Sequence, residues 1–276
     1  MANVLSRAYQ ELVIRCLVDG ASVRATERIS GVHRDTICRL LVRVGEGCES
    51  LMDVTMHDLA CQRIQVDEIW SFVGKKQRRL TAYDDATKSG DMWTFVAIDA
   101  DSKLIPCYRV GKRTGREAQA FIADLESRLS NRVQLSSDAL SAYVEAVELS
   151  FGSNVDYGQI VKSYEADPIG PGRYSPPRVV SVERTPITGA PDHAHISTSY
   201  VERQNLTMRM SMRRFTRLTN AFSKKVENMR AAVALHFAHY NFVRIHKTLR
   251  VTPAMEAGIS NHLWSVPELL DAAGSN

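Results

Sequence analysis

The chain has 276 residues, of which 44% are hydrophobic and 24% are charged, a composition typical of a globular protein and not of a disordered one. It contains no apolar run long enough to cross a bilayer and no signal-peptide pattern at its N-terminus, so we expect a soluble, cytoplasmic protein without a membrane contact. The formal net charge of +4 is small, but cations are concentrated in residues 203–230, which indicates a polyanionic partner.

Residues 1–55 are predicted to form a small helical domain. A first helix is followed by a second, which Ser22 is positioned to cap and which ends at Gly31. A third helix follows, and we expect Gly45 and Gly47 to close it. Two helices joined by a tight glycine-containing turn are typical of a helix-turn-helix, whose second helix enters the major groove of DNA. The alternative is a helical hairpin that only packs against the rest of the protein.

Residues 62–162 change to short runs that are rich in β-branched and aromatic residues. Three strands, a helix, a fourth strand, a second helix and a fifth strand are predicted in this order: RIQVDEIWSFV, MWTFVAIDA, LIPCYRV, GREAQAFIADLESRLS, RVQLSSD, ALSAYVEAVELSF and NVDYGQIV. Three antiparallel strands followed by right-handed crossovers make a mixed sheet flanked by helices. The predicted fold class is therefore α/β.

The segment 163–197 contains six of the nine prolines, together with several glycines. This composition does not favour regular structure, so we expect a long irregular insertion there. Beyond it, two long helices are predicted over about 199–218 and 222–245. Residues 251–276 are expected to form a C-terminal tail.

Three carboxylates lie at positions that suggest a functional role. Asp67 lies inside the first predicted strand, Asp138 ends the fourth, and Glu202 begins a helix. A charge within an apolar strand is costly unless it is paired or coordinated. Because strand side chains alternate, we expect Asp67 and Glu68 not to point to one site. The alternatives are an edge-strand charge at Asp67, a helix cap at Asp138 and a surface ion pair at Glu202.

The stretch from Glu202 to Arg230 carries eight lysines and arginines but only two acids. With 100° per residue, Arg209 and Arg213 lie close to the direction of Glu202, and Arg217 lies somewhat further round. They are too far along the helix axis to form i, i+4 ion pairs with Glu202. We therefore expect a basic ridge that follows DNA phosphates, with Glu202 holding a metal ion at its start.

Three blocks of the sequence resemble the signature blocks of the insertion-sequence-one family of bacterial DDE transposases: QVDEIWSFVGKK, LSSDALSAY and STSYVERQNLTMRMSMRRFTRLTNAFSKK. The similarity extends over about residues 60–250. It implies a ribonuclease-H-like catalytic domain in which Asp67, Asp138 and Glu202 are the catalytic and metal-binding residues. The implied cofactor is a pair of Mg²⁺ ions, with Mn²⁺ as a substitute, because these are hard cations that prefer oxygen ligands.

The resemblance also implies an activity and partners. The protein would bind double-stranded DNA at the ends of its insertion sequence, cut it, and join the 3′ ends to target DNA as a homodimer or larger oligomer associated with the nucleoid. The predicted DNA-contacting residues are Arg34, Thr36, Arg39, Arg203, Asn205, Arg209, Arg213, Arg217, Lys224 and Lys225. Two alternatives stay open: a helix-turn-helix regulator, which needs only the N-terminal helices, and a ribonuclease-H-like nuclease without strand transfer.

The chain departs from that family in two respects. Its five cysteines include no C-x-x-C pair, which predicts free thiols and no N-terminal zinc module. In addition, 63 residues separate Asp138 from Glu202, whereas the spacing in the family is far shorter. The Pro-rich segment 163–197 accounts for the difference.

Overall fold

In the computed structural model of the chain, residues 5–165, 178–216 and 220–274 are described. Within these ranges, six strands form one mixed sheet in the order β3-β2-β1-β4-β5-β6. The strands are β1 (Arg63–Val73), β2 (Gly90–Asp99), β3 (Tyr108–Gly111), β4 (Val133–Asp138), β5 (Val155–Glu165) and β6 (Arg178–Thr188). β1, β2 and β3 are antiparallel, β4 runs parallel to β1 and β5, and β6 returns antiparallel to β5. The predicted mixed sheet is confirmed, and its first five strands have the order of a ribonuclease-H-like core.

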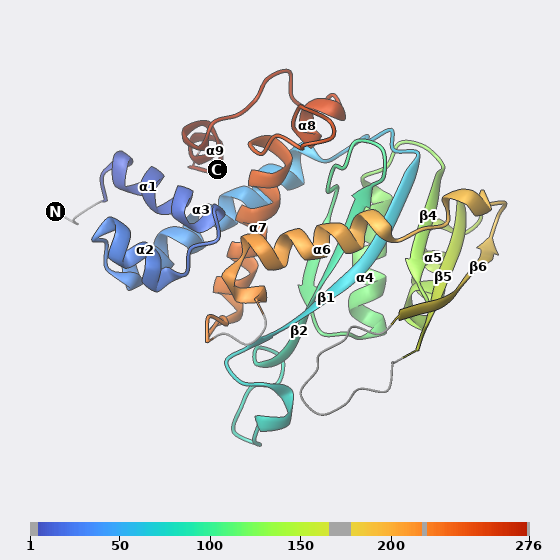
Figure 1. Ribbon diagram of the computed structural model, residues 1–276, viewed down its shortest axis with the longest axis horizontal. Helices are drawn as coiled ribbons and strands as arrows, with labels where there is room; N and C mark the ends of the chain where they lie inside the picture. The colour runs from blue at the N-terminus through green and yellow to red at the C-terminus, as the bar shows by residue number, and fades with distance from the viewer. Residues whose placement is uncertain (1–4, 166–177, 217–219, 275–276) are drawn as a thin grey trace.

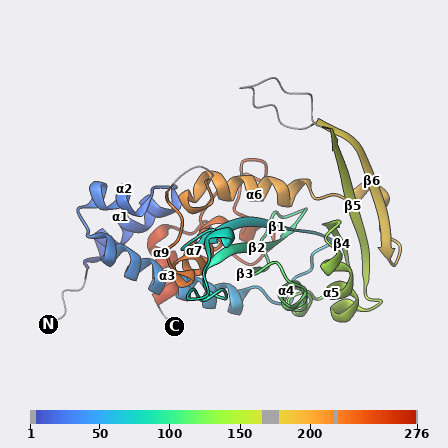
Figure 2. The ribbon, with the colours of Figure 1, turned by 90° about the horizontal axis from the view of Figure 1, so that it is seen from below.

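Helices cover both faces of the sheet (Figure 1). α6 (Ser199–Ser211) crosses one face over β1, whereas α4 (Gly115–Ser127) and α5 (Ser141–Phe151) lie on the opposite face. Figure 2 shows the sheet between these two helical layers. The predicted apolar stripe of α4 is confirmed, since Phe121 and Leu125 are buried against the sheet.

The N-terminal helices are α1 (Arg7–Val18), α2 (Val23–Ser30) and α3 (Arg34–Thr55). Ser22 caps α2 as predicted, because its Oγ accepts a hydrogen bond of 3.1 Å from the Ala25 N–H. Gly31 ends α2 with a left-handed φ of 70°, a conformation that glycine adopts without steric cost. The two helices and the glycine turn that joins them are therefore present, and their assignment as a DNA-binding helix-turn-helix stays a prediction.

The prediction that Gly45 and Gly47 close the third helix is wrong, because α3 continues to Thr55. These glycines instead let two C-terminal helices approach closely. A Cβ on Gly45 would lie 2.4 Å from the Cα of Ala231 in α7 (Val226–Phe242). A Cβ on Gly47 would lie 1.9 Å from the carbonyl oxygen of Ala273 in α9 (Val266–Gly274).

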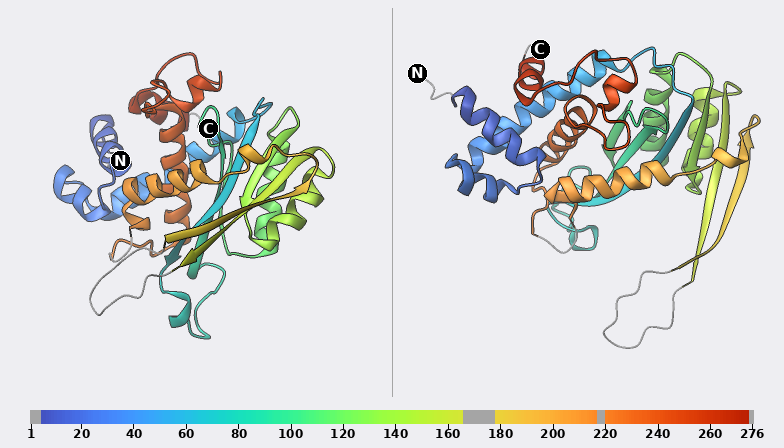
Figure 3. Two further views of the ribbon diagram at one scale, coloured as in Figure 1. Left: turned by 45° about the vertical axis from the view of Figure 1, so that its right-hand side comes forward. Right: turned by 45° about the horizontal axis from the view of Figure 1, so that its top comes forward.

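One hydrophobic core joins the N-terminal helices to the rest of the protein. Ile14 of α1, Leu41 of α3, Phe237 of α7 and Leu269 of α9 belong to the same cluster of buried side chains as the sheet residue Phe95. Figure 3 shows the N-terminal helices beside the C-terminal ones. The expected C-terminal tail therefore contains packed helices, α8 (Pro253–Glu256) and α9.

The prediction that 163–197 is irregular is wrong for much of its described part. β5 and β6 form a long antiparallel hairpin, and Figure 2 shows it extending past the layer of α6. β6 contains Pro186, which is tolerated because β6 is the edge strand of the sheet. The segment 166–177, which carries most of the other prolines, lies outside the described residues.

The two predicted long helices are both shorter in the structure. α6 ends at Ser211, Met212 has an extended backbone, and a 3₁₀ turn follows at Arg213–Phe215. α7 begins at Val226. All five cysteines are free thiols, as predicted. In the described part of the chain, we find no helix that is both long and apolar enough to span a membrane.

We expect Gly45→Ala to lower the free energy of unfolding by about 1–3 kcal/mol, because the new methyl group overpacks the α3–α7 contact. Urea denaturation measures this loss. Gly115→Ala is the matched control, since a Cβ there would meet no atom within 4 Å. Equal stability of the wild type and Gly45→Ala would refute the close helix contact.

Candidate functional site

Asp67 and Asp138 lie on neighbouring parallel strands, just beyond the point where these strands pair. The β1–β4 ladder ends at the pair Gln65↔Ser136. Two residues further along each strand, Asp67 and Asp138 reach the same level beside the gap between the strands. Together with Glu68, they form a group in which one carboxylate oxygen from each residue lies within 4.8 Å of the other two.

The prediction that Asp67 and Glu68 do not share one site is wrong. Their side chains do point to opposite faces: Asp67 Oδ2 accepts a 2.8 Å hydrogen bond from Asn205 on α6, whereas Glu68 Oε2 accepts one of 3.1 Å from Tyr143 on α5. Alternation holds, but both carboxylates border the same gap and so come close together. Sequence reasoning missed Glu68, and the only signal for it was a second acid directly after Asp67.

The three carboxylates differ in how their charges are compensated. Burial, followed by the neighbouring charge of Glu68, raises the pKa of Asp67 to about 7. Burial and the charge of Asp138 also raise the pKa of Glu68, but Arg113 opposes this and donates a 2.7 Å hydrogen bond from Nε to Oε1. Among the described residues, no cation pairs with Asp67, so a bound cation would stabilise its ionised form.

The carboxylate of Asp138 stabilises a turn and also lies in the site. Its Oδ1 accepts a hydrogen bond of 3.1 Å from the Leu140 N–H, and so it stabilises the turn before α5. The same carboxylate also belongs to the group with Asp67 and Glu68. The alternative of a helix N-cap at Asp138 is wrong, because the N-cap of α5 is Leu140, whose side chain makes no capping hydrogen bond.

Glu202 lies in the first turn of α6 and is exposed. Its carboxylate contacts residues that precede the arginines of this helix in the sequence. Its Oε1 accepts a 2.6 Å hydrogen bond from Thr198 Oγ1 and forms an ion pair with Lys162 of β5. Among the described residues, no group contacts Oε2. Glu202 is not part of the group within 4.8 Å, but its charge contributes to raising the pKa of Asp67. The ion-pair alternative is thus realised, with a partner that the sequence did not indicate.

Two polar residues attach α6 to β1 above the carboxylates. The buried Gln65 accepts hydrogen bonds of 2.8 and 3.3 Å from the N–H groups of Tyr200 and Val201, at the start of the helix. Further along α6, Asn205 is buried and donates to Asp67. Asn205, predicted to contact DNA, is therefore placed inside the carboxylate site.

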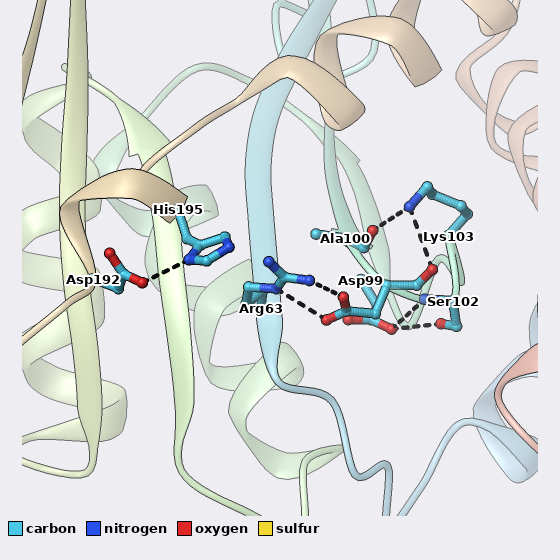
Figure 4. Close-up of polar contacts among 8 residues, drawn as sticks. Arg63, Asp99, Ala100, Ser102, Lys103, Asp192 and His195 are labelled. Carbon is cyan, nitrogen blue, oxygen red and sulfur yellow. Dashed lines mark hydrogen bonds and ion pairs between the residues drawn. The ribbon is translucent and has the colours of Figure 1, made fainter.

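Further polar contacts lie near Arg63, the first residue of β1, and in the 3₁₀ turn before α6 (Figure 4). Arg63 donates a 3.2 Å hydrogen bond to Asp101 in the turn between β2 and β3, and His195 contacts Asp192 at 2.8 Å in the 3₁₀ turn before α6. The ammonium of Lys103 lies 3.9 Å from the ring centroid of Tyr200, in the first turn of α6. The contact of Lys103 with Tyr200 therefore joins the β2–β3 turn to the first turn of α6.

The predicted basic ridge along one helix is wrong, because α6 ends before it is complete. Arg203 is exposed on α6, and Arg209 points towards the carbonyl oxygen of Phe215 at 3.5 Å. Arg213 lies in the 3₁₀ turn beyond the break, and Arg217 lies outside the described residues. The helix stops at this point because the extended backbone at Met212 allows both Met212 and Phe215 to enter the core.

Most of the remaining predicted DNA contacts line a groove of 1540 Å³ between the N-terminal helices and the segment 212–228. Thr36 accepts a 3.1 Å hydrogen bond from Arg39 beside it. The acids that line the groove are Asp35, Glu46 and Glu227. The cations that line it are more numerous and come from both walls: Arg24, Arg34, Arg39, Arg43, Arg213, Arg214, Lys224 and Lys225. The groove is therefore positively charged.

No protein-family model matches the chain, and no curated protein matches it. Among solved structures, the chain is similar to a piggyBac transposase synaptic complex with hairpin DNA, at 9% identity over 97% of this chain and 69% of that chain, with a TM-score of 0.45. The Mos1 mariner paired-end complex with Mn is 13% identical over 54% of this chain and 59% of that chain, with a TM-score of 0.22. The Mos1 strand transfer complex is 12% identical over 86% and 79%, with a TM-score of 0.25. Similarities at such TM-scores do not decide function, which rests on the residues of this chain.

The residues at the site fit a hard divalent cation. Asp67 and Asp138 supply the oxygen ligands that Mg²⁺ prefers, and Glu202 keeps one oxygen without a partner among the described residues. The raised pKa of Asp67 follows first from burial and then from the neighbouring charge of Glu68, and a bound cation would oppose both effects.

We expect Asp67→Asn to stabilise the metal-free protein at pH 8 by roughly 2–4 kcal/mol. The pKa of Asp67 is 3.8 in the unfolded chain and about 7 in the fold, so folding favours its protonated form. Stability is therefore highest below about pH 4 and is lost as the pH rises through 7. The asparagine keeps an acceptor for Asn205, and its advantage should vanish near pH 4 in urea denaturation with a chelator present.

The matched control for this change is Asp84→Asn. Hydrogen bonds from Lys75 and Thr81 hold the pKa of Asp84 near 2, so its removal should destabilise the protein at pH 8. Mg²⁺ should add stability to the wild type and little to Asp67→Asn. A variant no more stable than the wild type at pH 8 would show that Asp67 carries no uncompensated charge.

Proposed function

We propose that the chain is a DDE-type DNA transposase, a metal-dependent endonuclease and strand transferase whose catalytic carboxylates are Asp67, Asp138 and Glu202. The observation that carries this proposal is the close approach of the Asp67 and Asp138 carboxylates in the gap between two parallel strands. The raised pKa of Asp67 supports it, because carboxylates forced together are typical of metal and catalytic sites. The three sequence blocks that contain these residues point to the same chemistry.

Two Mg²⁺ ions are the proposed cofactor, with Mn²⁺ as a substitute. Asp67 and Asp138 would hold them, together with the unpartnered oxygen of Glu202. When bound, such ions activate a water or a 3′-hydroxyl and stabilise the oxygen that leaves phosphorus. Asn205 orients the carboxylate of Asp67, and Thr198 orients that of Glu202.

The basic groove is the proposed binding surface for double-stranded DNA at the ends of the element. α3 contributes Arg34 and Arg39 from the predicted helix-turn-helix, and the opposite wall contributes Lys224 and Lys225. Cations on both walls suit the two phosphate backbones of a duplex. Because cutting two DNA ends in one event needs two active sites, we further propose a homodimer or larger oligomer on DNA.

The proposal predicts metal-dependent cutting and joining of DNA taken from either side of the coding sequence. Asp67→Asn, Asp138→Asn and Glu202→Gln should each reduce the cutting rate at least ~100-fold, because each removes charge that holds the metal ions at the reacting phosphate. Gel assays with labelled duplexes and Mg²⁺ measure both steps. Glu148→Gln, at an exposed position on α5, is the control and should cut like the wild type.

The two steps separate the alternatives. Cutting without joining to target DNA would support a nuclease and remove strand transfer from the proposal. Specific DNA binding without any metal-dependent cutting would instead support a regulator and overturn the catalytic assignment.

A second prediction concerns the groove and uses the full chain, because residues 1–55 share the core and cannot be deleted cleanly. The double variant Arg34→Gln/Lys224→Gln removes one cation from each wall. It should weaken binding to any duplex and flatten the plot of log affinity against log salt by about 1.8, or about 0.9 for each lost phosphate contact. Arg116→Gln, exposed on α4 and outside the groove, should leave the slope unchanged. An unchanged slope in the double variant would move DNA binding to another surface.

A further inference from the structure

A second cavity, of 510 Å³, opens beside the far end of β1. Its apolar wall consists of Trp70, Phe72 and Phe222. The ring centroids of Trp70 and Phe72 are 5.9 Å apart, and those of Phe72 and Phe222 are 4.7 Å apart. All three side chains are only partly buried, so they retain ring surface that the core does not cover.

The rest of the cavity is basic. The cations that line it are Lys75, Lys76, Arg79 and Arg214, and its described lining includes no acid. Lys75 forms an ion pair of 2.7 Å with Asp84, outside the cavity lining. Lys76 lies 5.9 Å from the ring centroid of Phe72. The cavity therefore combines aromatic surface with positive charge.

Arg214 is the most informative of these cations. Burial lowers its pKa to about 10, and its guanidinium donates a 2.7 Å hydrogen bond to Ser223 Oγ. It forms no ion pair with any carboxylate in the described parts of the chain. Arg214 is half-buried and has no anionic partner among the described residues, so a bound anion would offset the cost of its partial desolvation.

The cavity also lies along an edge of β1 that leads from the carboxylate site. β4 pairs with β1 only as far as Gln65, and the next partner on that side is Ser223, opposite Val73. Between them, Asp67 and Trp70 are three residues apart, or about 10 Å along the strand. Their side chains point to opposite faces of the sheet, so a DNA strand bound at Asp67 would reach the cavity across the unpaired edge of β1.

We propose that Trp70, Phe72, Phe222 and Arg214 form a pocket for one unpaired nucleotide of the DNA substrate. The base would stack on the aromatic rings, and its phosphate would lie against Arg214. A nucleotide combines a flat aromatic group with an anion, which matches both walls, and the volume lies within the range of about 300–1,000 Å³ found for small-ligand sites. A paired base must leave its stack to enter such a pocket. The inference rests on the proposed function, since it assumes a DNA substrate.

The experiment compares two labelled single strands of equal length, an oligothymidine and an oligonucleotide whose sites are abasic, by fluorescence anisotropy with the full chain. Trp70→Ala and Phe222→Ala should each weaken binding of the oligothymidine about 5- to 100-fold, because each removes a stacking surface. Binding of the abasic strand should not change. Arg214→Gln should weaken binding of both strands and flatten the salt dependence by about 0.7.

Two control variants distinguish loss of the pocket from a general loss of folded protein. Trp70→Phe retains an aromatic ring and should keep most of the preference for the oligothymidine. Tyr9→Ala removes an exposed aromatic residue of α1 outside the pocket and should have no effect. Equal losses on both strands in Trp70→Ala, or no preference in the wild type, would overturn the pocket. If the wild type still cuts duplex ends in that case, the proposed function stands. If the preference for the oligothymidine is preserved but the protein cuts no DNA, the pocket is supported and the proposed transposase function is refuted.

Discussion

The attachment of α6 to β1 is the constraint on which the candidate site depends. Gln65 fixes the start of the helix, and the hydrogen bond from Asn205 to Asp67 fixes its rotation one turn later. Because both contacts are buried, losing either would leave an unsatisfied polar group and cost about 1–3 kcal/mol. These two contacts set the position of the first turn of α6, and Thr198 and Lys162 then hold the carboxylate of Glu202.

The site concentrates negative charge and compensates it unevenly. Arg113 and Tyr143 hold the charge of Glu68 on one face of the sheet, and Lys162 holds that of Glu202 on the other. Asp67 lies between them and pairs with no cation in the part of the chain that the structure describes. The fold therefore carries an electrostatic cost at the residue that would bind metal, and this is the usual relation between stability and function at catalytic sites.

The first five strands and the order of the elements around them could be predicted from the sequence, because each has its own periodicity and the cap at Ser22 is local, whereas β6 was missed because its proline favoured an irregular segment. The carboxylates of Asp67 and Asp138 were found for similar reasons: each follows or interrupts a clear apolar run. Features that depend on distant segments were missed. Gly45 resembles a helix stop when the contact with Ala231 is unknown, and the partner of Glu202, Lys162, comes from a remote strand. Glu68 was excluded because side chains alternate along a strand. That rule does not consider that β1 and β4 separate beyond Gln65, where carboxylates on opposite faces can approach each other.

The hairpin of β5 and β6 has a consequence for how the chain can vary. Its ladder begins at the pair Tyr157↔Thr188, so the chain leaves the core and returns to nearly the same place. The entropic cost of closing a loop grows only with the logarithm of its length, so a span of this size costs about 2 kcal/mol more than a tight turn. The candidate site therefore places little constraint on the sequence distance between Asp138 and Glu202. Selection can lengthen or shorten the hairpin for other reasons without displacing either carboxylate.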